Sequence, residues 1–164
     1  MMKDTIKTIY CELLGQAIKS QLDELGIPQN EVSSYFNDNV ELISPAAISQ
    51  IVRGKRNITC NTADALQETL GLRNPKNLFF PNLSFCETLV VQLIHLLSTD
   101  ELFNGKHVQK LLQENEDKID KNITTIANSL YNFFPDFPEE ESSYQISESI
   151  EFWVIELVAL ISQL

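Results

Sequence analysis

A chain of 164 residues, 43% of them hydrophobic and with only 5 Gly and 6 Pro, can bury a core, which excludes a disordered chain. Its three cysteines lie far apart with no CxxC pair, so we expect neither a disulfide scaffold nor a metal site, and no cofactor. The most apolar stretch, residues 150–164, carries two glutamates and is shorter than the roughly 20 residues that cross a bilayer. Without a signal-peptide pattern at residues 1–15, the sequence predicts a cytoplasmic protein.

The charge of the chain is unevenly distributed. Residues 1–81 hold eight Lys or Arg and nine Asp or Glu, a net charge of −1, whereas residues 82–164 hold four Lys and fourteen Asp or Glu, a net charge of −10. Phosphate binding relies on Lys and Arg, so only the first half is suited to DNA, and the acidic half is suited to contact with protein. We therefore expect two domains, 1–81 and 82–164.

The first predicted elements are two helices. Apolar residues recur every three or four positions over residues 9–25, which indicates an amphipathic helix that Gly26 ends. Pro28 suits the first turn of a short second helix. The polar, turn-prone residues at 37–43 then predict a loop.

Helical spacing continues through the rest of the first half. Ser44 followed by a proline predicts the start of a third helix, which Gly54 ends. Residues 59–62 offer several caps for a fourth helix that Gly71 terminates, and the apolar residues 78–80 are expected to pack back on it. No alternating strand pattern occurs.

The second half is also predicted to be helical. Residues 85–97 have one wide apolar face and indicate a buried helix. Further helices are expected over 100–115 and 117–133. Two prolines and the acidic run at 139–141 place a surface loop at 132–143, before a final helix over 146–164. The fold class predicted for the whole chain is therefore all-α.

A particular order of motifs runs through residues 14–80. Leu14-Gly15 and Ile18-Lys19 precede the segment LGIPQNEV at 25–32, the segment SPAAISQIVRGKR at 44–56, the pair Ala65-Leu66 with Leu70-Gly71-Leu72, and Leu78-Phe79. This order of helix, short helix, recognition helix and closing helix resembles the Cro/repressor (XRE) family of helix-turn-helix proteins. The resemblance implies a λ-repressor-like N-terminal domain that binds double-stranded DNA.

In that family the third helix lies in the major groove, with its N-terminal side chains directed at base edges. The matching residues here are Ser44, Ala46, Ala47 and Gln50. Gln50 is the best base-reading candidate because an amide can pair with two atoms of adenine, and the alanine methyl groups are expected to contact thymine.

The resemblance also implies contacts to the DNA backbone. Gln29 opens the second helix, where its amide and the free backbone N–H groups suit a phosphate. Arg53, Lys55, Arg56 and Asn57 follow the recognition helix and are expected to hold phosphates.

Two features depart from the family pattern. The loop between the second and third helices is about five residues longer than usual. Pro45 and the two alanines offer few hydrogen bonds, so specificity is expected to rest on few base contacts or on DNA shape.

The residues assigned to DNA contact also have simpler interpretations. The segment 53–56 is alternatively a basic turn that caps a helix, and Gln50 an ordinary exposed glutamine. His95 and His107 lack a carboxylate at a ligand spacing, so we interpret them as core or surface residues. Because no phosphate-binding loop or nucleophile motif occurs, we expect no enzymatic activity.

The final helix carries an apolar face formed by Phe152, Ile155 and Ala159, with Trp153 and Leu160 nearby. Its simplest role is the core of the second half, and the alternative is a dimer interface. The two are compatible, because helix-turn-helix proteins commonly pair to match half-sites about 34 Å apart.

These observations predict a sequence-specific transcriptional regulator, most simply a repressor, that acts as a homodimer through its C-terminal helices. The alternative is that the acidic half inhibits another protein, in the manner of an antitoxin, an anti-CRISPR protein or another DNA mimic. In that case the helix-turn-helix domain would repress its own promoter.

Overall fold

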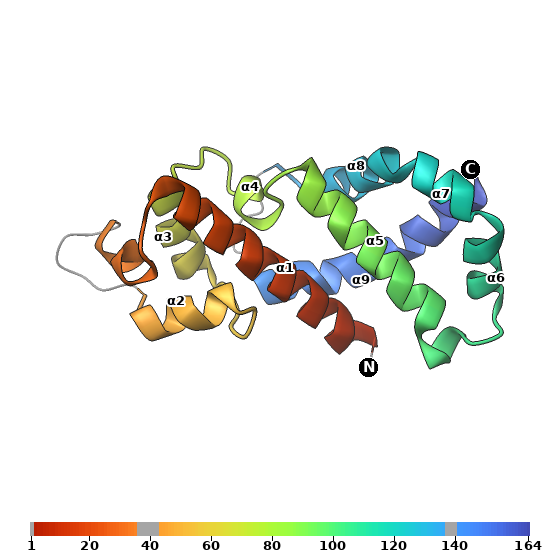
Figure 1. Cartoon of the computed structure of the whole chain (residues 1–164), viewed down its shortest axis with the longest axis horizontal. Helices are drawn as coiled ribbons and strands as arrows, with labels where there is room; N and C mark the ends of the chain where they lie inside the picture. The colour runs from red at the N-terminus through yellow and green to blue at the C-terminus, as the bar shows by residue number, and fades with distance from the viewer. Residues whose placement is uncertain (1, 36–42, 137–140) are drawn as a thin grey trace.

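In the computed structural model the chain is all α-helical, as predicted. The structure describes residues 2–35, 43–136 and 141–164, with the backbone alone at 33–35, and none of these residues lies in a strand. The helices form an elongated body with η1, α2 and α3 at one end and α6 and α7 at the other (Figure 1). Their bounds are α1 Met2–Leu25, the 3-10 helix η1 Gln29–Tyr35, α2 Pro45–Val52, α3 Cys60–Leu70, α4 Lys76–Phe79, α5 Leu83–Thr99, the 3-10 helix η2 Glu101–Phe103, α6 His107–Glu114, α7 Glu116–Lys121, α8 Ile123–Phe133 and α9 Ser143–Ser162.

Helix α1 runs through the middle of the molecule and contacts both halves (Figure 1). It begins at residue 2, well before the predicted start at residue 9. The additional turns pack against the core through Ile6, which is fully buried. On their surface Lys3 forms an ion pair with Glu148 of α9 at 3.1 Å, and the ammonium of Lys7 lies 4.7 Å from the ring centre of Tyr144. Its buried side chains recur every four residues: Ile6, Tyr10, Leu14, Ile18 and Leu22.

The predicted third and fourth helices are confirmed as α2 and α3. The side-chain oxygen of Ser44 accepts a hydrogen bond of 3.1 Å from the backbone N–H of Ala47, so the cap forms where the sequence places it. Gly71 ends α3 with a φ of 66°, a left-handed conformation that other residues adopt at a cost.

The segment before α2 differs from the prediction in type. The short second helix, η1, is a 3-10 helix rather than an α-helix, and it packs against α2 and α3. The loop predicted at 37–43 lies outside the described residues, apart from Ile43, which is buried. The apolar residues 78–80 are buried, as expected.

Two helices predicted in the second half are each divided in two. The segment 100–115 forms η2 and α6, separated at Gly105, whose φ is 70°. The segment 117–133 forms α7 and α8, separated at Asn122. The side-chain amide of Asn122 donates a hydrogen bond of 2.7 Å to the carbonyl oxygen of Lys118, and such local bonds compete with a continuous helix.

The prediction that the apolar face of the last helix forms core is wrong for its most apolar members. Trp153 is fully buried in α9, but Phe152 and Ile155 are 68% and 72% exposed. Ala159 is also exposed, and Leu160 is half-buried. Neither α9 nor any other helix of the described residues is long and apolar enough to cross a membrane.

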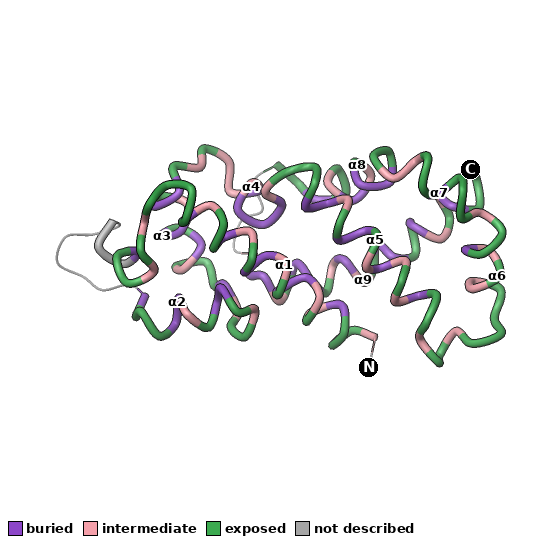
Figure 2. Tube along the Cα trace, in the orientation of Figure 1, coloured by how far each residue is buried: buried purple, intermediate pink, exposed green. Residues whose placement is uncertain are grey.

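The buried residues of the two predicted domains form one continuous core, which follows the inner sides of the helices (Figure 2). The ring of Phe80 lies 6.1 Å from that of Tyr10, 6.5 Å from that of Phe85 and 4.6 Å from that of Phe134. The hydroxyl of Tyr10 donates a hydrogen bond of 2.9 Å to the carbonyl oxygen of Phe79. The domain division at residue 81 stays a prediction, and both halves depend on this shared core.

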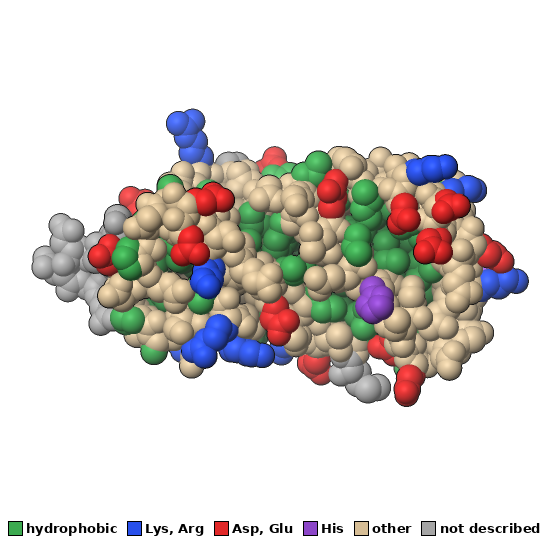
Figure 3. Space-filling model, viewed as in Figure 1, with side chains coloured by type: hydrophobic (Ala, Val, Ile, Leu, Met, Phe, Trp, Pro, Cys, Tyr) green, Lys and Arg blue, Asp and Glu red, His purple; other side chains and the backbone are tan. Residues whose placement is uncertain are grey.

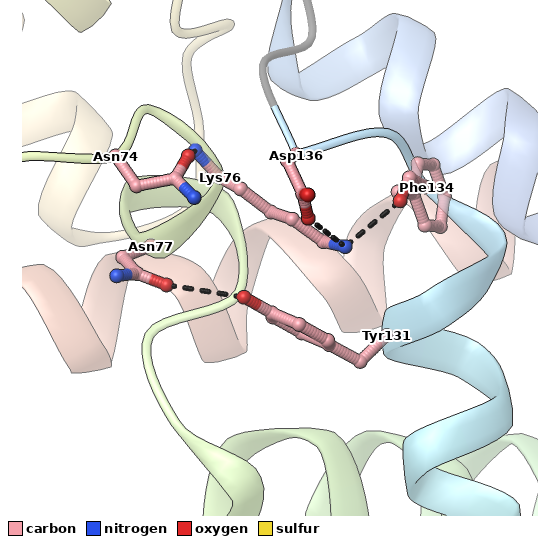
Figure 4. Close-up of polar contacts among 6 residues, drawn as sticks. All are labelled: Asn74, Lys76, Asn77, Tyr131, Phe134 and Asp136. Carbon is pink, nitrogen blue, oxygen red and sulfur yellow. Dashed lines mark hydrogen bonds and ion pairs between the residues drawn. The ribbon is translucent and has the colours of Figure 1, made fainter.

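A buried lysine joins the same two halves (Figure 4). The side chain of Lys76 in α4 is only 2% exposed. Its ammonium donates a hydrogen bond of 2.8 Å to the carbonyl oxygen of Phe134, lies 3.7 Å from a carboxylate oxygen of Asp136 and sits 3.8 Å from the ring centre of Tyr131. A buried cation needs such partners, so Lys76 ties α4 to the end of α8.

Candidate nucleic-acid interface

Helix α2 turns one face to the core and the other to solvent. Its exposed side and the turn that follows it present Ala46, Gln50, Arg53, Lys55 and Arg56. In Figure 3 a group of Lys and Arg side chains lies along the lower edge of the α2 end, and others lie at the opposite end of the molecule. The structure therefore brings together most of the residues that the sequence assigns to DNA contact.

Two of the residues predicted to face bases, Ala47 and Ser44, have structural roles. Ala47 lies on the core side of α2 and is 5% exposed, so its methyl group cannot reach a thymine, and we correct that assignment. Ser44 is exposed, but its side-chain oxygen accepts the capping hydrogen bond from Ala47. Ala46 and Gln50 remain on the exposed face.

Helix α2 is held against α1 by two glycines. A β-carbon on Gly15 would lie 2.6 Å from the carbonyl oxygens of Ile51 and Val52, so only glycine allows α1 to approach α2 this closely. Gly54 has a φ of 72°, and a β-carbon there would lie 2.7 Å from the backbone of Glu12. The end of α2 and the basic turn are thereby fixed on α1.

The long polar side chains of this surface bond to one another. Arg56 donates a hydrogen bond of 3.3 Å to the side-chain oxygen of Gln50. Arg53 donates to the carbonyl oxygen of Ser49 at 3.1 Å and to its hydroxyl at 2.9 Å. These bonds restrict the side chains before any ligand binds, which lowers the entropy lost on binding.

Lys55 lies close to an acidic neighbour. Its ammonium is 3.8 Å from a carboxylate oxygen of Glu12 in α1, and both side chains are largely exposed. An exposed ion pair of this kind contributes little free energy, so Lys55 can exchange Glu12 for a phosphate at small cost.

Gln29 begins η1, as predicted for the start of the second helix, and is half-buried. Because η1 is a 3-10 helix, its backbone dipoles align less well than those of an α-helix. The phosphate contact predicted for Gln29 stays a prediction.

Asn57 does not present its carbonyl oxygen to solvent. That oxygen accepts hydrogen bonds of 3.0 Å from the hydroxyl of Ser143 and from the backbone N–H of Tyr144, at the start of α9. The Ser143 hydroxyl also accepts a hydrogen bond of 2.8 Å from the N–H of Ile58. Asn57 therefore links the basic turn to α9 through this oxygen. A phosphate would instead accept a hydrogen bond from the side-chain NH2 group, so the DNA-backbone contact predicted for Asn57 stays a prediction.

Sequence reasoning missed two residues of this surface. Ser49 positions Arg53, and the four-residue spacing of the pair along a helix was a signal that could have identified it. Ser143 accepts a hydrogen bond from the N–H of Ile58, which follows the basic turn and lies 85 residues earlier in the chain. No local sequence pattern predicts such a contact.

The cysteine and histidine side chains lie outside the surface around α2. Within the described ranges, no group of three or more His, Cys, Asp or Glu side chains is arranged to hold a metal ion. Cys11 and Cys86 are buried, and burial raises the pKa of each thiol to about 11, whereas Cys60 is exposed. His95 and His107 lie on the surface, one of the two locations expected for them.

Comparison with known proteins assigns no family. We find no family model, no curated protein and no solved structure that matches this chain.

Proposed function

We propose that this protein is a sequence-specific DNA-binding regulator of transcription, most simply a repressor, that acts as a homodimer in the cytoplasm. The observation that supports it is the exposed face of α2, which continues directly into a turn with three basic residues and is fixed on α1 by Gly15 and Gly54. A rigidly mounted helix of this kind can enter a groove without losing its own order.

The dimensions of α2 suit the major groove. With its side chains an α-helix is about 10–12 Å across, and the groove is about 12 Å wide. In this proposal Gln50 reads a base edge, with Ala46 beside it as an apolar contact to a thymine methyl group. Arg53, Lys55 and Arg56 bind phosphates on either side and set the position of the helix.

The acidic half has a role in the same proposal. Residues 82–164 carry a net charge of −10 and are repelled by the phosphate backbone. The repulsion favours orientations in which α2 faces the duplex, and it weakens non-specific binding. Net charge alone therefore does not argue against DNA as the ligand.

Selection of duplexes from a random pool by the purified chain tests the proposal. The best duplex and a shuffled version are then titrated at two salt concentrations. We expect an inverted repeat, bound more tightly than the shuffled duplex, with an affinity that falls steeply with salt because phosphate contacts release counterions. Arg73→Ala, an exposed arginine outside the proposed surface, is the matched control and should bind as the wild type does.

The absence of any enriched sequence would contradict the proposal. An unchanged affinity after simultaneous replacement of Gln50, Arg53 and Arg56 by alanine would contradict the assignment of the surface. In the first case the acidic half as a protein-binding inhibitor becomes the better hypothesis.

A further inference from the structure

Helix α9 presents an apolar stripe to solvent. Phe152 and Ile155 are the two most exposed large apolar side chains in the described part of the chain, at 68% and 72%. They lie three residues apart on one helix, and Ala159 continues the stripe one turn further. Exposed apolar side chains that line up in this way usually mark a contact surface.

A hollow lies beside the stripe. Its volume is about 370 Å³, and Phe152 and Ile155 form one of its walls. The other walls come from the start of α1, the end of α5, η2 and α6, through Met2, Leu97, Phe103 and Val108. One face of the molecule therefore carries both a projecting apolar ridge and a recess whose lining is apolar apart from Glu151.

The shape of this face decides between possible occupants. Small molecules bind in pockets that cover about 70–90% of their surface, whereas one wall of this hollow is formed by the two most exposed large apolar side chains of the described residues, Phe152 and Ile155. A protein surface can cover such an open face. In a two-fold pair the same patch meets itself, so a ridge next to a recess is self-complementary.

We infer that a second copy of this chain covers the face, with Phe152 and Ile155 of each protomer seated against the hollow of its partner. The inference rests on the proposed function, which requires two copies for two half-sites, and it names the surface that joins them.

The composition of this face suits the centre of a pair. A standard interface buries about 800 Å² on each partner, with an apolar centre and a polar rim. Phe152 and Ile155, at 68% and 72% exposure, supply the centre, and the edges of half-buried residues in and around the hollow extend it: Met2, Phe103, Val108 and Val158. The polar residues around them would form the rim.

Helix α9 also connects this face with the DNA-contacting surface. A capping box between Ser142 and Gln145 fixes its first turn, and Ser143 is bonded to Asn57 and Ile58, directly after the basic turn. A helix of 20 residues spans about 30 Å as one rigid rod. Pairing through α9 therefore sets the orientation of the two α2 helices relative to each other.

The charges on α9 give the pair a distinctive salt dependence. The helix contains three glutamates and no Lys or Arg. Glu151 and Glu156 flank the apolar stripe on opposite sides, and pairing two copies brings these carboxylates together. Salt screens repulsion between exposed like charges, so the pair becomes tighter as salt rises, opposite to the trend for DNA binding.

Sedimentation equilibrium of the full chain without DNA tests the inference. The probes are the wild type, Ile155→Asp and Val91→Asp, each at about 50 and 500 mM salt. Val91 is 54% exposed on α5 and outside the stripe, so it is the matched control. We expect a wild-type dimer that is tighter at high salt, an Ile155→Asp dissociation constant raised at least about tenfold, and a control that pairs as the wild type does.

Since both replaced side chains are exposed, circular dichroism should show the same helix content in all three proteins. A wild-type chain that is monomeric at about 50 µM overturns the inference, as does an Ile155→Asp variant that still pairs. Because no DNA is present, this result is independent of the duplex selection. A dimer that selects no duplex would contradict the proposed DNA binding and leave the pairing in place. A monomer that selects a single half-site would contradict the pairing and leave sequence-specific DNA binding in place.

Discussion

The ammonium of Lys76 donates a hydrogen bond of 2.8 Å to the carbonyl oxygen of Phe134, 58 residues further along the chain. The contact lies beside the shared aromatic cluster, where the ring of Phe134 is 4.6 Å from that of Phe80. A single buried side chain thus connects the segment that follows α3 with the end of α8. Any change that separates the two halves must break this bond.

Replacing Lys76 by methionine should keep most of the packing and remove the polar contacts. It leaves the Phe134 carbonyl oxygen without the lysine donor, which costs about 1–3 kcal/mol in the free energy of unfolding. Urea denaturation measures the change. Asp136→Asn is the control, because the Asp136 side chain is 78% exposed and its ion pair should contribute under about 1 kcal/mol. Equal effects of the two substitutions would show that the buried hydrogen bond is not the important contact.

Gly54→Ala should destabilise the protein for two reasons. The left-handed φ of 72° costs about 1–2 kcal/mol for a residue with a β-carbon, and the contact with the Glu12 backbone adds about 1–3 kcal/mol. Gly26→Ala shares the left-handed conformation at φ 68° but meets nothing within 4 Å, so only the first cost applies. Thermal and urea unfolding of both variants separate the two contributions. If the two variants lose the same stability, a β-carbon at residue 54 does not clash with the backbone of Glu12 in α1.

Arg56→Ala should weaken binding to every duplex and lower the salt slope by about 1, as for any phosphate contact. Gln50→Ala should instead cost about 1–3 kcal/mol on the selected duplex and little on a shuffled one. Fluorescence anisotropy titrations at several salt concentrations measure both. A loss on both duplexes after Gln50→Ala would assign this residue to the DNA backbone.

The hydrogen bond between Arg56 and Gln50 predicts that the two substitutions are coupled. If Arg56 holds Gln50 in its reading position, the double variant should lose less than the sum of the single losses, by about 0.5 kcal/mol or more. Additive losses would indicate that the bond is broken in the complex.

The buried thiols predict a loss of stability at alkaline pH. Desolvation raises the pKa of Cys11 and Cys86 from 9.0 to about 11, so the folded chain holds these protons at pH values where the unfolded chain has released them. The stability that this difference provides is complete below pH 9 and is lost as the pH rises from 9 towards 11. The pKa of buried Tyr10 is raised as well, which acts in the same direction at higher pH.

Urea unfolding at several pH values above 8 measures this loss, which should be about 1–3 kcal/mol for each thiol. Replacing the exposed Cys60 by serine should leave the pH dependence unchanged, and Cys86→Ala should remove part of it. A free energy of unfolding that stays constant up to pH 11 would contradict the assignment.

The sequence by itself determined the all-α class and where most helices lie, because apolar spacing and end signals are local properties. Ser44 caps α2 and Gly71 ends α3 as predicted, since a cap depends on a few neighbouring residues. The positions of the basic turn and of Gln50 on one exposed surface could be inferred in the same way. The break at Asn122 was missed because apolar residues at 119, 123 and 126 keep a helical spacing across it. The break at Gly105 had a local signal, the turn-prone pair Asn104-Gly105, which the prediction did not use.

Only the tertiary structure decided which side of each helix meets another. Ala47 and Ala46 are neighbours of the same type, yet α1 covers one side of α2 and leaves the other to solvent. Asn57 is bonded to α9, and Phe152 and Ile155 face outward because the adjacent Trp153 fills the core. Burial and long-range hydrogen bonds depend on elements far apart in the chain, so a local sequence pattern does not predict them.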